Sequence, residues 1–334
     1  MAIGFLKEIP KNWKKVKYTT MRLEIKQWAL WLSVVFALSG CLDMKHEGTG
    51  NDIPTKGEVI MHFDRSDSFV IEQLIHQFEL EYPQAKIIPK YFSHQELLDL
   101  LNKGEIKGVF LHRSFTNSDK SVLERQKVKV RSVMVYKSSA ALIANRDLES
   151  SIKLSDFLLW LTGENTLPHE SLALYGRGGR FLELADSMVK RSNKSIKRKI
   201  IACNSPRTVF ETVKTNKTIL GIVGINWISD DGDSFAISLR KQVRILGFLD
   251  EIDRSAMEIN PISTGSSLLT YPFQSQIADN SYPFIEPVWG YDLQGYSGLV
   301  SGFLAFVCSH PGQVLIKKSG LYPALPPHRT IEIQ

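Results

Sequence analysis

Cysteine is scarce in this chain of 334 residues, where it occurs three times, at Cys41, Cys203 and Cys308. No cysteine or histidine lies at the short spacing that a zinc site requires, so the sequence predicts no metal site. Cys203 and Cys308 both follow apolar residues, which favours buried free thiols. An oxidising compartment would also allow the two thiols to pair, and the sequence leaves both arrangements open.

Sequence patterns of catalysis and nucleotide binding are also missing. The glycine-rich turn at 175–180 has neither the spacing of G-x-G-x-x-G nor the Lys-Ser/Thr of a P-loop. The acidic run at 230–233 lacks the glutamate that completes an EF-hand loop, and we expect an exposed turn there. No motif pairs a nucleophile with a base or two carboxylates with each other. The sequence therefore predicts neither an enzyme nor a bound cofactor.

Net charge is nearly absent from most of the chain, although the whole chain carries +6. Residues 1–40 contain seven Lys and Arg against two Glu, which leaves 34 basic and 33 acidic residues for positions 41–334. The basic character therefore belongs to the N-terminal segment. We expect no nucleic-acid partner, because such a partner requires a basic surface on the folded part.

The N-terminal segment has the pattern of a secretory signal. Its apolar run from Trp28 to Leu38, broken only by Ser33, is too short for a membrane-spanning helix, which needs about 20 residues. Basic residues precede the run and small residues follow it, as in a signal peptide. The sequence Leu-Ser-Gly-Cys that ends at Cys41 resembles a bacterial lipobox. Residues 1–40 are therefore predicted to be removed, and Cys41 to carry the lipid that anchors the chain to a membrane of the cell envelope, on its periplasmic or outer surface.

The remaining chain begins with a polar stretch and then alternates strands with helices. Residues 41–56 are rich in Gly, Asp and Lys and are predicted to form a flexible tether. Strands are expected at 59–63, 86–91 and 108–111 with helices between them, an order that favours a parallel sheet covered by helices. Later strands are expected at 131–136, 140–144, 218–223 and 287–293. Positions 229–282 show no clear pattern.

Several stretches occur in the order in which a known family has them. They lie at 141–145, 154–157, 220–224, 282–289, 302–307 and 311–323, and the last three correspond to that family's YP…RP strand, FLxF helix and GQ…GxxP ending. On these residues the chain, from about Gly57 onward, resembles the phosphate-binding-protein-like members of the type II periplasmic solute-binding proteins, which serve ABC transporters.

The resemblance implies an α/β fold of two lobes, each a mostly parallel sheet flanked by helices, joined by two crossing strands. Lobe one is expected at 57–138 plus 283–334, and lobe two at 139–282. A small anion, phosphate first, is expected in the cleft between the lobes, and the permease of an ABC transporter is the expected partner.

The candidate ligand-binding residues lie at three helix starts and one loop. Backbone N–H groups and hydroxyls at helix starts bind oxyanions, and the helix dipole adds positive potential. The candidates at the helix starts are Ser66, Asp67, Ser68, Phe69, Ser93, Arg177, Gly178, Gly179 and Arg180. His112 and Arg113, in the loop after the third strand, complete the set.

Two departures from the family pattern leave the ligand open. The family's phosphate loop reads Ser-Gly-Thr where this chain has Arg177-Gly178-Gly179, and an acidic residue or a Ser-Arg pair often stands in place of His112-Arg113. Without an acidic acceptor for the proton of phosphate, sulfate or a carboxylate is an equal alternative, since arginine pairs bidentately with each of them.

The same residues have ordinary structural roles as well. Serines at helix starts are common caps, glycines can serve only their turn, and arginines can be solvated. This alternative corresponds to a non-transporting envelope lipoprotein on the same scaffold, a sensor or structural partner with an altered or empty ligand site.

The signal segment yields a prediction about the translated protein. A start at Met21 gives a leader of ordinary length before Cys41, so residues 1–20 are expected to be absent from the cellular protein. Mass spectrometry of the protein from its native host tests this, and peptides from residues 1–20 would contradict it.

Overall fold

The computed structural model describes residues 52–175, 180–190, 194–250 and 268–327. The predicted signal segment and the lipidation site Cys41 lie outside these residues, as do Arg177, Gly178 and Gly179. Within the described residues, no single helix has the length and apolar composition to cross a membrane. Only the bent pair Leu299–Cys308 and His310–Lys318 together meets those criteria.

The first lobe is built on three parallel strands. They are β1 (Gly57–Asp64), β2 (Ala85–Phe92) and β3 (Gly108–Leu111), with β1 in the middle. The flanking helices are α2 (Ser68–Glu81), α3 (His94–Lys103), α4 (Asn117–Arg125), α10 (Leu299–Cys308) and α11 (His310–Lys318). A short 3-10 turn, η1 (Arg65–Asp67), links β1 to α2, and β13 (Tyr322–Pro323) pairs with β4 near the end of the described chain.

The second lobe repeats this plan. Strands β6 (Ser171–Tyr175), β7 (Lys199–Cys203) and β8 (Ile219–Gly224) are parallel, with β6 in the middle. Its helices are α5 (Leu154–Leu161), α6 (Arg180–Lys190), α7 (Pro206–Thr215), η2 (Ile225–Trp227), α8 (Ser234–Gln242) and α9 (Gln274–Ala278). Strand β9 (Val243–Ile245) pairs with β4, and β5 (Ser151–Lys153), β10 (Gly247–Asp250) and β11 (Leu268–Thr270) form a small separate sheet.

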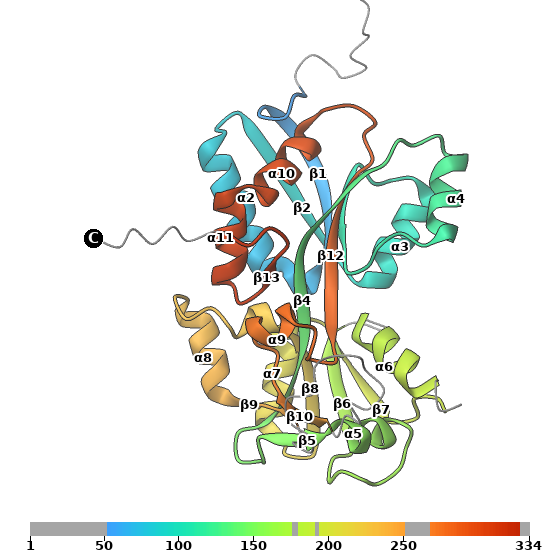
Figure 1. Ribbon diagram of the computed structural model, residues 1–334, viewed down its shortest axis with the longest axis vertical. Helices are drawn as coiled ribbons and strands as arrows, with labels where there is room; N and C mark the ends of the chain where they lie inside the picture. Colours follow the sequence, from blue (N-terminus) through green and yellow to red (C-terminus); the bar gives the residue numbers. More distant parts are fainter. Residues whose placement is uncertain (1–51, 176–179, 191–193, 251–267, 328–334) are drawn as a thin grey trace, which may run out of the picture. The chain divides into compact units, whose positions relative to one another are not determined.

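Two antiparallel strands connect the lobes, β4 (Arg131–Asn145) and β12 (Ile285–Asp292). From Arg131 to Ser139, β4 pairs with β12, and from Ala140 it pairs with β8 and β9 of the second lobe. Figure 1 shows both strands running lengthwise between the two groups of helices. The chain therefore has the expected two-lobed α/β fold with two crossing strands. The lobe limits at 138 and 282 stay a prediction.

Strand β4 differs from the sequence expectation in its length. We expected two strands at 131–136 and 140–144, because the polar Lys137, Ser138 and Ser139 interrupt an apolar pattern. The structure has one continuous strand of 15 residues. The polar residues remain in the strand because they lie at the junction of the lobes, where Ser138 and Ser139 pair with the start of β12.

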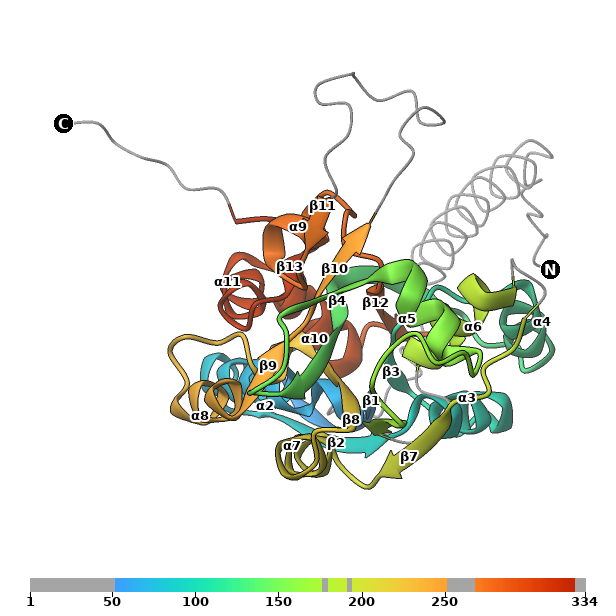
Figure 2. The same ribbon diagram turned by 90° about the horizontal axis from the view of Figure 1, so that it is seen from below.

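Aromatic side chains fill the interior of each lobe. In the first lobe, Phe303 of α10 packs against Phe63 and Phe110 of the sheet, with ring centroids 6.4 and 6.0 Å away. In the second lobe, Phe181 of α6 packs against Phe284 at 4.8 Å. Figure 2, a view from below, shows the helices distributed on both faces of the strands. These packed interiors hold the strand ends in place.

Gln313 connects helix α11 to the crossing strand β4. Its side-chain amide is 1% exposed and donates to the carbonyl oxygens of Val135 and Val307, at 3.1 and 2.7 Å. Its carbonyl oxygen accepts from the backbone N–H of Leu325 at 2.9 Å. This glutamine belongs to the GQ…GxxP ending noted in the sequence, and the structure gives it a supporting role.

We expect Gln313→Ala to lower the free energy of unfolding by roughly 2–4 kcal/mol, because it leaves buried backbone groups without partners. Chemical denaturation measures this. The control is Gln95→Ala, which removes an exposed helix-surface glutamine and should change stability by less than about 0.5 kcal/mol. Equal effects of the two substitutions would contradict the supporting role of Gln313.

Candidate functional site

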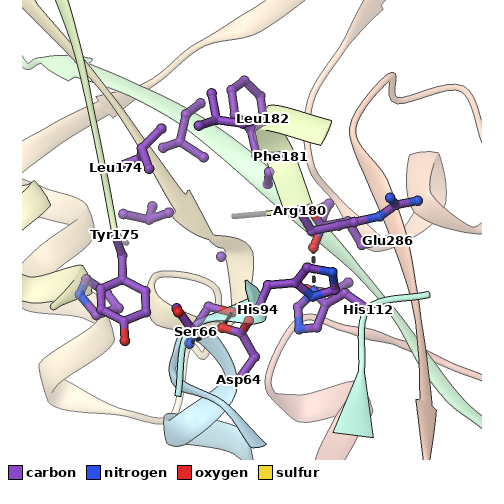
Figure 3. Close-up of a pocket in the computed structure, with 18 residues that line it drawn as sticks. Asp64, Ser66, His94, His112, Leu174, Tyr175, Arg180, Phe181, Leu182 and Glu286 are labelled. Carbon is purple, nitrogen blue, oxygen red and sulfur yellow. Dashed lines mark hydrogen bonds and ion pairs between the residues drawn. The ribbon is translucent and has the colours of Figure 1, made fainter. Parts of the chain in front are cut away.

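A cavity of about 70 Å³ lies between the two lobes. Its volume exceeds the roughly 10–15 Å³ that one water molecule needs. It lies where the carboxyl ends of β1 and β3 face those of β6 and β8, the usual position of a ligand site in an open α/β sheet. The lining residues are Asp64, Ser66, Ser93, His94, His112, Ser138, Ser139, Ala140, Leu174, Tyr175, Arg180, Phe181, Leu182, Pro206, Ile222, Val223, Gly224 and Glu286. Figure 3 shows the charged side chains from the first lobe and the crossing strand close together.

His112 lies at the centre of a buried network. Its Nε2 is 2.6 Å from Oδ2 of Asp67, and its Nδ1 is 2.5 Å from Oε2 of Glu286. The hydroxyl of Tyr136 also donates to Oδ2 of Asp67, at 3.0 Å. Because both ring nitrogens face carboxylate oxygens, both must donate, which requires the doubly protonated imidazolium.

The protonation of His112 follows from two opposing effects. Burial alone would lower the pKa of this imidazole, because it disfavours a charge. The charges and hydrogen bonds of Asp67 and Glu286 outweigh burial and raise the pKa of His112 well above its usual value. His112 is therefore a cation at neutral pH, and its charge offsets one of the two carboxylates beside it.

The serine hydroxyls predicted to bind an oxyanion already have partners inside the protein. The hydroxyl of Ser66 donates to Oδ1 of Asp64 at 2.7 Å, and that of Ser93 donates to Oε2 of Glu96 at 2.8 Å. Ser93 also accepts from the backbone N–H of Glu96, which completes a capping box at the start of α3. Both serines line the cavity, and both stabilise local turns.

Other polar atoms at the cavity have no hydrogen-bond partner. Nine buried side-chain atoms in the described residues lack one, and four of these belong to residues of the lining. They are Oγ of Ser139, Nε of Arg180, and both ring nitrogens of His94. Since a buried polar atom without a partner is costly, their concentration at one cavity indicates a place where a ligand completes the bonding.

The imidazole of His94 is buried, and two effects act on its pKa in opposite directions. Burial lowers the pKa of its imidazole, and the nearby carboxylate of Glu183 opposes that shift only in part. The closest pair of atoms, Nε2 of His94 and Oε1 of Glu183, is 3.5 Å apart, at the limit of a hydrogen bond. At neutral pH His94 therefore presents one N–H donor and one acceptor nitrogen.

Contacts across the cleft show that the lobes are close together. The guanidinium of Arg65, in the first lobe, donates to the carbonyl oxygen of Asn204 at 3.2 Å. The same group lies 5.2 Å from the ring centre of Tyr175 in the second lobe. The indole of Trp227 donates to the carbonyl oxygen of Ser66 at 2.7 Å. The structure thus has the arrangement expected of a closed cleft.

The described candidates fall into three groups: residues that line the cavity, one residue behind the lining, and residues that do not line it. Ser66, Ser93, His112 and Arg180 line the cavity, and Asp67 lies directly behind His112. The remaining described candidates, Ser68, Phe69 and Arg113, are not among the lining residues. Phe69 packs against Trp227 with centroids 6.1 Å apart, and Arg113 pairs with Asp119 at 2.5 Å. Their roles toward a ligand stay predictions.

Sequence reasoning missed Asp64, Glu286, His94 and Ser139. Asp64 directly follows the apolar Phe63 at the end of β1, a position that often carries function. Glu286 is an acid inside the otherwise apolar stretch 285–289 of β12. Both are buried carboxylates on the cavity lining, beside the positions where the sequence offered only His112 and Arg113.

Comparison with solved structures identifies the fold. The chain is similar to a protein described as a phosphate ABC transporter substrate-binding protein, with phosphate bound, from Clostridium perfringens. The two share 13% identity at a TM-score of 0.60, over 80% of this chain and 100% of that one. An ABC-type phosphate transport receptor from Vibrio cholerae aligns at a TM-score of 0.54, with 13% identity and the same coverage. No family model and no curated protein matches the sequence. The likeness shows a periplasmic-binding-protein-like fold, and the function has to be argued from the cavity.

The imidazolium of His112 predicts a pH dependence of stability. A pKa raised by folding stabilises the protein fully below the unfolded value of about 6.5, and this contribution is lost as the pH rises toward the folded value. The difference in unfolding free energy between the wild type and His112→Gln should therefore shrink above about pH 6.5, by at most about 1.4 kcal/mol per pH unit. Denaturation at several pH values measures it. A difference that is constant or grows from about pH 6.5 to 9 would show that His112 is not held as the cation.

Proposed function

We propose that this chain is a solute-binding protein that holds a small, proton-bearing oxyanion between its lobes, phosphate first, and delivers it to an ABC transporter. The observation that carries the proposal is the group of unpartnered polar atoms at the cavity, on Ser139, Arg180 and His94. Buried polar atoms without partners are costly, so a cavity lined by several of them is a candidate binding site for a polar ligand.

The donors at the cavity match the oxygens of an oxyanion. Among the described residues, the Ser139 hydroxyl and the Arg180 Nε–H have no hydrogen-bond partner, and His94, whose Nε2 lies 3.5 Å from Oε1 of Glu183, carries one N–H. Arg180 already pairs with Glu183 through Nη1 at 2.7 Å, so this acid partly offsets its charge. Hydrogen bonds therefore contribute more to holding the anion than a surplus of positive charge does.

The acceptors at the cavity require a ligand that donates. Asp64 and Glu286 are carboxylates on the lining, 7% and 6% exposed. A phosphate that keeps a proton donates an O–H to a carboxylate, whereas a fully ionised anion has no proton to offer to Asp64 or Glu286. This arrangement favours phosphate over sulfate and over simple carboxylates, which were equal alternatives on the sequence alone.

Transport also requires attachment and delivery. We propose that lipid on Cys41 anchors the chain, and that residues 42–51 give the two lobes reach toward a permease. The predicted tether is shorter than 41–56, because Asp52 accepts hydrogen bonds from the Tyr296 hydroxyl and from the backbone N–H of Leu299 in the first lobe. Closure of the lobes would proceed by a hinge at the crossing strands β4 and β12.

Calorimetry with phosphate and sulfate tests the ligand. We expect the purified chain to bind phosphate with a dissociation constant below the millimolar range at about pH 7, and to bind sulfate at least about 100-fold more weakly. Sulfate has no proton to donate at that pH, so it would lie beside the negative charges of Asp64 and Glu286 without a hydrogen bond to either. Equal affinity for the two anions would overturn the role of these carboxylates, and no binding of either would overturn the function.

Ser139→Ala tests the donor set. Its removal should weaken phosphate binding about tenfold or more, the range for a hydrogen bond to a charged group. Ser187→Ala is the matched control, because Ser187 lies on the exposed surface of α6 and donates only to the carbonyl oxygen of Leu184. The control should bind phosphate as the wild type does. An unchanged affinity of Ser139→Ala would remove Ser139 from the site.

One observation favours a second function, that of a non-transporting sensor or structural partner. The hydroxyls of Ser66 and Ser93 have partners within the protein, and so does His112. The same calorimetry separates the two functions, because the second predicts that no small anion binds.

A further inference from the structure

We propose that Arg65 holds the mouth of the cleft closed and so sets how fast a bound solute is released, without contacting the solute. The mouth is the side of the cleft farthest from the crossing strands β4 and β12. Arg65 is thus a positioning residue, which acts through the closure of the lobes. Its effect on solute release rests on the proposed function, whereas its effect on closure can be measured without a ligand.

The guanidinium of Arg65 joins the two ends of the main sheet. The strand order is β2-β1-β3-β12-β4-β8-β6-β7, so β2 and β7 are outermost and the crossing strands lie in the middle. Arg65 donates to the carbonyl oxygen of Tyr91 in β2 and to that of Asn204, directly after β7, both at 3.2 Å. Figure 2 shows β2 and β7 together, below β4 and β12.

The distance from the crossing strands makes this contact sensitive to opening. Neighbouring strands lie about 4.8 Å apart, so β2 and β7 are each roughly 14 Å from the nearer crossing strand along the sheet. When one lobe turns against the other about the crossing strands, atoms separate in proportion to their distance from that axis. Contacts between the strand ends at the mouth are therefore the ones that opening separates most.

Tyr175 gives Arg65 a second contact with the second lobe. The central carbon of the guanidinium lies 5.2 Å from the centre of the phenol ring, within the range of about 6 Å for a cation–π contact. Tyr175 is the last residue of β6 and lines the cavity. Arg65 is not among the described residues of the lining, so its contribution to binding comes from holding the lobes together.

The three contacts of Arg65 have different fates when the cleft opens. The hydrogen bond to Tyr91 lies within the first lobe, so it persists and keeps the guanidinium directed toward the mouth. The contacts with Asn204 and Tyr175 cross between the lobes, so they exist only in the closed cleft. These two contacts stabilise the closed arrangement relative to the open one.

Other contacts between the lobes lie closer to the crossing strands. The indole of Trp227 and the amide of Asn226 donate to the carbonyl oxygen of Ser66, at 2.7 and 3.1 Å. Both belong to η2, which follows β8, the neighbour of β4. Opening about the crossing strands displaces these groups less than it displaces Asn204. Arg65 therefore controls the mouth, and η2 supports the same turn from the hinge side.

This arrangement predicts an effect on the rate of release and not on the rate of capture. A solute held between the lobes leaves only after they separate, so losing contacts that exist only in the closed cleft speeds release. A solute enters the open cleft, in which Arg65 does not contact the second lobe, so the association rate should not fall.

Stopped-flow mixing of the purified chain with phosphate, followed by tryptophan fluorescence, tests this for Arg65→Ala. We expect the dissociation rate constant of phosphate to rise about tenfold, the effect of losing one hydrogen bond from a charged group together with one cation–π contact. The association rate constant should stay within about twofold of that of the wild type.

Arg198→Ala is the matched control. The guanidinium of Arg198 also donates to two carbonyl oxygens, those of Trp160 and Glu164 at 3.0 and 2.7 Å, and also lies over an aromatic ring, that of Trp160 at 4.8 Å. All these contacts lie within the second lobe. The control loses the same kinds of interaction and should release phosphate as the wild type does. Thermal unfolding checks that both variants are folded.

Small-angle X-ray scattering without added anion measures closure directly. Arg65→Ala should have a larger radius of gyration than the wild type, because more molecules are open, and Arg198→Ala should not. If Arg65→Ala does not fold, Arg65→Lys replaces it, since a lysine keeps the charge but cannot reach two carbonyl oxygens with a planar fork. Its release rate should lie above that of the wild type.

The outcomes separate this inference from the proposed function. Phosphate release that is unchanged in Arg65→Ala, or raised equally in Arg198→Ala, would overturn the role of Arg65 and leave the proposed function standing. Slower association with unchanged release would also overturn it, because it would indicate a direct contact with the ligand. If the wild type binds no phosphate, the proposed function fails and scattering decides alone. An unchanged radius of gyration in Arg65→Ala would then overturn the inference as well.

Discussion

Two buried carboxylates can lie near each other in this protein because an imidazolium lies between them. Asp67 belongs to the turn before α2, Glu286 to the crossing strand β12, and His112 follows β3. Without the cation, two negative charges would repel each other in a medium that screens poorly. The three residues therefore fix the relative positions of a helix start, a strand end and a crossing strand. The floor of the cavity depends on that arrangement.

The same network sets the charge balance at the cavity. His112 offsets one of the three carboxylates of Asp64, Asp67 and Glu286, and the Arg180–Glu183 pair adds no net charge, so negative charge predominates among these residues. In the proposed function, recognition depends on hydrogen-bond direction, with donors on Ser139, Arg180 and His94 and acceptors on Asp64 and Glu286. A site of this kind would distinguish oxyanions by whether they carry a proton.

The sequence predicted the fold more fully than the site. The alternation of strands and helices predicted a parallel sheet covered by helices, and the family resemblance implied the two lobes. The structure and its likeness to solved proteins confirm this two-lobed α/β architecture. Most of the segment 229–282 could not be interpreted, because its described elements β9, β10, β11 and α9 are only three to five residues long, too short to show periodicity.

The site was harder because its important contacts join distant parts of the chain. His112 and Glu286 are 174 positions apart, and no local pattern indicates that they meet. Helix-start serines were visible as candidates, but a sequence cannot show that Ser66 and Ser93 already donate to neighbouring carboxylates. Ser139 was overlooked because it seemed to lie in a break between two strands.

The continuity of β4 has a mechanical consequence for Ser139. This residue is the last one on β4 to pair with β12, immediately before β4 begins to pair with β8. It therefore lies beside the axis about which one lobe would turn against the other, and points near an axis travel least. The walls of the cavity, with Leu182 on one side and His94 on the other, would move farther than Ser139 when the lobes close. A solute entering an open cleft would therefore find the Ser139 hydroxyl close to the position that it has in the closed cleft.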